Sequence, residues 1–68
     1  MKLSARNVLK GKIVGIARAS TMTRVSLDIG GTIVTAAITT VAVDDLKLEV
    51  NQQAYAVVDA TNIMVGID

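Results

Sequence analysis

Three polar side chains suited to anion binding lie close together near the start of the chain. Ser4, Arg6 and Asn7 combine a hydroxyl, a guanidinium and a carboxamide within four residues. They supply several hydrogen-bond donors and one fixed positive charge, and charge-assisted hydrogen bonds are the strong ones. The cluster therefore predicts an oxyanion site. A second interpretation stays open from residue types alone, in which Arg6 pairs with a carboxylate of a neighbouring subunit.

Short sequence motifs that include this cluster are spaced along the whole chain. In order they are Ser4-Ala5-Arg6-Asn7, Gly11-Lys12-Ile13-Val14, Gly30-Gly31, Ala37-Ile38-Thr39, Ala54-Tyr55-Ala56-Val57-Val58, Ala60-Thr61 and Ile63-Met64-Val65-Gly66. Taken in register, they resemble the molbindin (Mop) family of small molybdate-binding proteins, whose domain recurs as the TOBE domain of molybdate transporter ATPases and molybdate-responsive regulators. The resemblance covers essentially all of residues 1–68 and implies a single molbindin/TOBE-like domain.

Composition limits both the size of the protein and the chemistry open to it. A chain of 68 residues forms one domain at most and buries too little of its own surface to be comfortably stable. Yet 51% of its residues are hydrophobic, which predicts that the excess is buried between subunits. The chain has no Cys and no His, so disulfides, the usual metal ligands and the usual general base are absent.

Several classes of function are poorly supported. The adjacent acids Asp44 and Asp45 fall on an expected solvated helix face, so we expect no enzyme activity. No apolar run has the length of a membrane span, and the first residues lack the apolar core of a signal peptide, so we expect a cytoplasmic protein without a membrane partner. The first 24 residues carry six positive charges and no negative one. Proteins that bind single strands stack bases on aromatic rings, and Tyr55 is the one aromatic residue, so we expect no nucleic-acid partner.

Hydrophobic periodicity predicts five strands and one short helix. The strands are expected at 8–19, 22–29, 32–39, 53–59 and 63–67, and the helix at 40–47 after a capping threonine. Gly30-Gly31 is typical of a two-residue hairpin turn. The last two strands are apolar on both faces, which favours an oligomer interface.

This order of elements predicts an all-β fold, a five-stranded OB-like barrel with one short helix between strands 3 and 4. The resemblance implies the same fold. Strict alternation in the first strand predicts that two sets of side chains lie on opposite faces, namely Leu9, Gly11, Ile13, Gly15 and Ala17 against Lys10, Lys12, Val14, Ile16 and Arg18.

The resemblance also implies a function. It implies a homo-oligomer, a hexamer built as a trimer of dimers, that binds molybdate or tungstate between its subunits for storage and homeostasis. The metal would enter only as the oxyanion ligand and not as a free cation. The oxyanion-binding residues that it implies are Ser4, Arg6, Asn7, Thr39, Ala60 and Thr61.

Two positions depart from the family pattern. Ala42 stands where several relatives have serine, and Asp59 stands where relatives commonly have lysine. A unit charge about 4 Å away interacts by about 4 kcal/mol at an effective dielectric near 20, so a carboxylate beside the anion would weaken binding strongly. Either Asp59 pairs with Arg6 of the next subunit, or it points away and leaves hydroxyls and backbone N–H groups to bind.

The alternative function is a structural or regulatory assembly module of the same fold that has lost the oxyanion. The choice among molybdate, tungstate and sulfate stays open as well, because it depends on the radius of the cavity.

Overall fold

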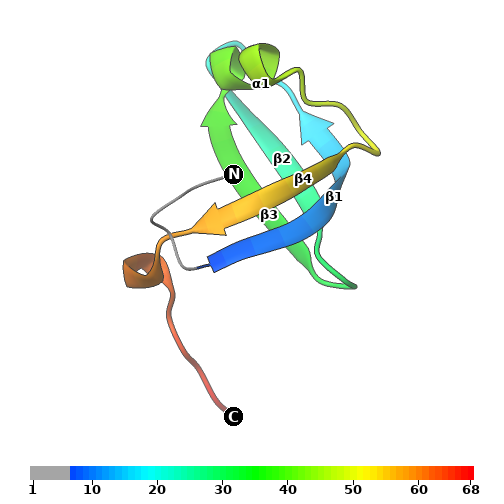
Figure 1. The fold of residues 1–68 in the computed structure, drawn as a ribbon. Helices are drawn as coiled ribbons and strands as arrows, with labels where there is room; N and C mark the ends of the chain where they lie inside the picture. Colours follow the sequence, from blue (N-terminus) through cyan, green and yellow to red (C-terminus); the bar gives the residue numbers. More distant parts are fainter. Residues whose placement is uncertain (1–6) are drawn as a thin grey trace.

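The computed structural model describes residues 7–68, which form a curled, four-stranded antiparallel sheet with one short helix (Figure 1). The strands are β1 (Asn7–Ala17), β2 (Met22–Asp28), β3 (Ile33–Thr39) and β4 (Gln53–Val58), in the spatial order β3-β2-β1-β4. Helix α1 (Thr40–Leu46) lies between β3 and β4 in the chain, and a short 3-10 turn, η1 (Ala60–Asn62), follows β4. The predicted all-β class and the position of the helix are confirmed.

Strand β1 joins the two halves of the sheet. Its first part pairs with β4 and its second part pairs with β2. Between Ile13 and Gly15 the register against β2 shifts by one residue, which is a β-bulge at Val14. A bulge bends its strand and reverses the faces of the residues that follow. Ile16 therefore pairs with Val25 and packs against the core, so the face predicted for it by strict alternation is wrong.

A two-glycine turn connects β2 to β3, as predicted. Gly30 and Gly31 have φ values of 90° and 99°, a region that glycine enters without a side-chain clash. The N–H of Ile29 donates to the carbonyl of Thr32 at 2.9 Å, and the two glycine N–H groups donate to the carboxylate of Asp28 at 3.1 and 2.7 Å. These bonds fix the hairpin.

The core is small for so apolar a chain. Ile13, Val25, Leu27 and Val43 are at most 4% exposed, and Thr23 is fully buried beside them. Val43 reaches this core from α1, so the helix covers one end of the curled sheet (Figure 1). Many other large apolar side chains are exposed, which agrees with the predicted excess of hydrophobic surface.

The predicted fifth strand does not form within one chain. Residues 63–68 carry no strand pairing, and Met64, Val65 and Ile67 are 93–96% exposed. The prediction is not confirmed in the single chain, because η1 turns the backbone off the end of β4 and the last residues then run away from the sheet (Figure 1). The sheet consequently stays open, with β3 and β4 as its two edges. No helix within residues 7–68 is long and apolar enough to span a bilayer.

Candidate functional site

The amino end of β1 and the turn after β4 form one group of candidate residues. Ser4 and Arg6 lie outside the described residues, so their predicted roles stay predictions. Asn7, half-buried, begins β1 opposite Val58, the last residue of β4. Ala60 and Thr61 follow two and three residues later in η1, and both are exposed. The antiparallel pairing of β1 with β4 thus brings three of the six predicted residues to one end of the sheet.

Asp59 occupies the start of this turn. Its carboxylate accepts a hydrogen bond from the N–H of Thr61 at 3.4 Å, and its carbonyl accepts one from the N–H of Asn62 at 3.0 Å. Asp is among the preferred capping residues because its short side chain reaches the free N–H groups of the first turn. Asp59 therefore directs its negative charge at a backbone N–H of the predicted anion-binding turn, and neither bond uses the N–H of Ala60.

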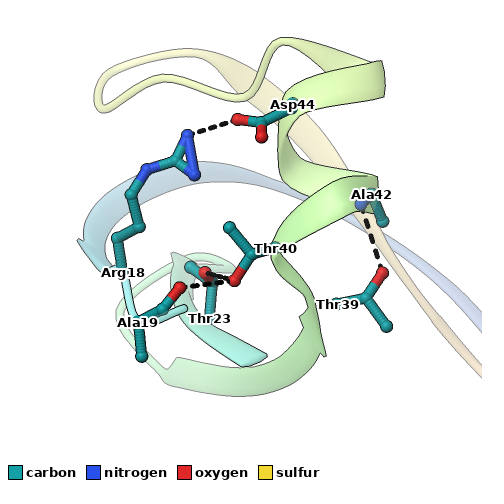
Figure 2. Close-up of polar contacts among 7 residues, drawn as sticks. All are labelled: Arg18, Ala19, Thr23, Thr39, Thr40, Ala42 and Asp44. Carbon is teal, nitrogen blue, oxygen red and sulfur yellow. Dashed lines mark hydrogen bonds and ion pairs between the residues drawn. The ribbon is translucent and has the colours of Figure 1, made fainter. Parts of the chain in front are cut away.

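Thr39, the remaining predicted residue, ends β3 and caps α1. Its Oγ1 accepts a hydrogen bond from the N–H of Ala42 at 3.1 Å (Figure 2). A threonine hydroxyl has one donor and two acceptor positions, so the capping bond leaves the O–H free to donate. Thr39 is exposed and can therefore cap the helix and contact an anion at the same time.

A set of side-chain contacts fixes the position of α1 behind Thr39. The Thr40 hydroxyl donates to the carbonyl of Ala19 at 2.7 Å and lies 2.8 Å from the hydroxyl of the buried Thr23 (Figure 2). Arg18 forms an ion pair with Asp44 on the helix. Sequence reasoning missed this arrangement, because Arg18 and Asp44 are 26 residues apart and no local pattern links them.

The two groups of donors do not meet within one chain. Asn7 stands at one end of β1, and Ala17 stands at the other, where it pairs with Arg24 of β2. Two residues further along β2 in the same direction, Met22 pairs with Thr39. Thr39 therefore lies beyond the end of β1 that is opposite Asn7. Figure 1 accordingly shows η1 and α1 at different ends of the sheet. A site that uses both groups must therefore take them from different copies of the chain.

The donor set suits an anion better than a cation. Within residues 7–68 no group of three or more His, Cys, Asp or Glu side chains is placed to hold a metal ion. A hydroxyl, a carboxamide and exposed backbone N–H groups instead provide hydrogen-bond donors, which an oxyanion accepts.

Comparisons with known proteins agree on one family. The TOBE domain family model matches residues 3–65. The probable molybdenum-pterin-binding protein of Haemophilus influenzae is 46% identical over 69 residues, with 100% of both chains covered. Molybdenum-pterin-binding protein 2 of Clostridium pasteurianum is 38% identical, with 96% of this chain and 97% of that protein covered. The structure of a molybdate-binding protein from Sporomusa ovata superposes with a TM-score of 0.94 at 36% identity, over 98% of this chain and 100% of that one. The chain therefore belongs to the TOBE domain family, as a relative of the molybdenum-pterin-binding (Mop) proteins.

Proposed function

We propose that this protein binds molybdate or tungstate between copies of itself, and that it stores the oxyanion in the cytoplasm. The role is binding rather than catalysis. The names of the relatives support the class of ligand. The observation that carries the proposal is that the donor groups lie at two separate ends of the sheet, so that assembly is needed to bring them together.

Each proposed ligand group has a stated part in binding. The O–H of Thr39 donates from one copy, and the carboxamide of Asn7, the N–H of Ala60 and the hydroxyl of Thr61 donate from another. Arg6 and Ser4 add a positive charge and a further hydroxyl. Hydrogen bonds to a charged group contribute roughly 1.5 to 3 kcal/mol each, so a few of them can hold a tetrahedral dianion.

The same assembly would complete the five-stranded OB-like barrel. A hollow of about 550 Å³ lies between the two edge strands. Inward-facing apolar residues line it, among them Val34, Ala36 and Ile38 on β3 and Ala54, Ala56 and Val58 on β4. We propose that residues 63–67 of a second copy add a strand there.

Energy and geometry both support this pairing. Burying a side chain such as Met64, Val65 or Ile67 contributes roughly 1.5 to 3 kcal/mol, and each is almost fully exposed in one chain. An open sheet edge also presents unpaired backbone groups that favour pairing with another strand. Each copy has one hollow and one such segment, so two copies can exchange them reciprocally. Three dimers of this kind would give the hexamer.

Isothermal titration calorimetry of the dialysed protein with molybdate, tungstate and sulfate tests the binding proposal. We expect saturable binding of molybdate and tungstate, weak or no binding of sulfate, and a stoichiometry set by the number of subunit boundaries. Light scattering on the same sample gives the oligomer size. Equal heats for all three anions, or none for molybdate and tungstate, would contradict the storage function.

A second candidate function follows from Asp59. Because its carboxylate already accepts from the N–H of Thr61, the chain supplies a negative group of its own at the turn. The protein would then be a structural or regulatory assembly module without an oxyanion. An intact oligomer that gives no heat with any of the three anions would favour this candidate.

A further inference from the structure

The outer face of the sheet, on the side away from the core, carries a shallow hollow of about 360 Å³. It opens on the opposite face of the sheet from the apolar hollow between the edge strands, although Thr35 lines both. Its lining residues come from the second half of β1 and from the facing parts of β2 and β3, and they are Gly15, Ile16, Ala17, Arg24, Ser26 and Thr35.

Gly15 creates the space, and the sheet itself does not require glycine there. A Cβ at Gly15 would meet only the Cβ and Oγ of Ser26, at 3.8 and 3.9 Å, which is ordinary contact. Gly15 does not adopt a positive φ either. Gly11 differs, because a Cβ there would lie 2.7 Å from the carbonyl oxygen of Asp28. Glycine in a strand interior lowers the stability of the fold, and no contact within the chain requires the empty volume at Gly15.

The hollow is lined by groups that bind anions. Ser26 and Thr35 lie opposite each other on the outer face, so their hydroxyls share one row across the sheet. Arg24 is exposed in the next row, where its two neighbours are Ala17 and Ala37. These small neighbours leave room for the guanidinium to turn toward the hydroxyls.

Arg24 also lacks an acidic partner. Across residues 7–68 the single ion pair joins Arg18 to Asp44, and residues 1–6 contain no acidic side chain that could supply another. The carboxylate of Asp28, on the same face, accepts hydrogen bonds from the N–H groups of Gly30 and Gly31 and forms no ion pair with Arg24. A guanidinium without a carboxylate partner, beside two hydroxyls and an empty volume, can bind a tetrahedral oxyanion through two parallel N–H groups.

We propose that Arg24, Ser26 and Thr35 form a second oxyanion subsite over Gly15, which takes a small tetrahedral anion such as phosphate. The guanidinium provides the charge and the two hydroxyls donate to the remaining oxygens. This subsite lies within one chain and does not depend on the molybdate site between copies.

Amide chemical shifts of the ¹⁵N-labelled oligomer, titrated with inorganic phosphate at fixed pH and ionic strength, test the subsite. We expect the amides of Gly15, Ser26 and Thr35 to shift and to saturate together. Arg24→Gln should weaken this binding at least tenfold. Gly15→Ala should also weaken it by narrowing the hollow, and it should not lower the melting temperature, because its Cβ meets no close contact.

Lys10→Gln is the matched control, because it removes one positive charge from the same face of β1 outside the hollow. We expect it to change the phosphate affinity less than twofold. Three results would overturn the proposal: no shifts at these three amides, shifts that do not saturate, or an equal loss of affinity in Lys10→Gln. Because the shifts report each site separately, failure of the molybdate site would not hide this one.

Discussion

Replacing Asp59 by asparagine removes the negative charge at the η1 turn while keeping the side-chain cap. Asparagine is as good a capping residue as aspartate, and its carbonyl oxygen can accept the N–H of Thr61 as the carboxylate does. The change therefore alters the charge beside the anion without removing the hydrogen bond that caps the turn. If an oxyanion binds at this turn, its affinity must rise when the charge is removed.

The expected size of the effect follows from the exposure of Asp59. Two unit charges about 4 Å apart interact by about 1 kcal/mol in water and about 4 kcal/mol at an effective dielectric of 20. An exposed carboxylate belongs near the lower value, and a dianion doubles it to about 2 kcal/mol. Asp59→Asn should thus tighten molybdate binding by about 30-fold. Asp59→Lys should tighten it further, although the loss of the cap costs about 1 kcal/mol of turn stability.

Calorimetric titration of the wild type and Asp59→Asn at several salt concentrations measures this effect. Glu49→Gln is the control, because it removes one negative charge from an exposed loop away from η1. We expect a change below twofold in the control, and a gain in Asp59→Asn that shrinks as salt rises. Affinities of the wild type and Asp59→Asn that agree within twofold would refute the placement of the anion beside Asp59.

Three further perturbations test the other parts of the account. Thr39→Ala should lower the unfolding free energy by about 1 kcal/mol in denaturant titrations and weaken molybdate binding, whereas Thr39→Ser should preserve both, because only the hydroxyl caps α1. Val65→Asp should dissociate the oligomer in light scattering while Val41→Asp, at another exposed valine, should not; equal behaviour would count against strand addition. Gly11→Ala should cost about 1 to 3 kcal/mol in thermal unfolding because its Cβ collides with β2, whereas Gly15→Ala should stabilise by about 0.5 to 1 kcal/mol.

Local signals in the sequence predicted much of the fold. Gly30 and Gly31 adopt the positive φ values that a two-residue hairpin requires, and a threonine caps the helix as expected. Such features depend on a few neighbouring residues, so their physics is visible in the sequence. The predicted bounds of the four strands and the helix differ from the structure by two residues or fewer at each end.

Features that depend on distant pairing could not be predicted in the same way. The bulge at Val14 arises from the pairing of β1 with β2, and it moves Ile16 to the core against the simple alternation. The apolar pattern of residues 63–67 predicts a segment that needs burial, but it does not say whether the partner strand belongs to the same chain. The ion pair of Arg18 with Asp44 likewise depends on tertiary structure.

The candidate site was predicted in parts. Periodicity and turn residues placed Thr39 at a helix start and Ala60 and Thr61 in a turn, and the structure confirms these positions. Their separation to different ends of the sheet follows from its topology, which the residue types alone do not encode. The capping bond that the Asp59 carboxylate accepts from the N–H of Thr61 was also not foreseen.

Crystals of the protein grown with tungstate, measured at the tungsten absorption edge, test the central claim most directly. Anomalous difference density locates the metal without reference to any assumed site. The account predicts peaks at boundaries between copies, with Thr39 of one copy and Thr61 of another in contact with the same anion. Absence of tungsten at those boundaries, or peaks contacted by one copy alone, would contradict it.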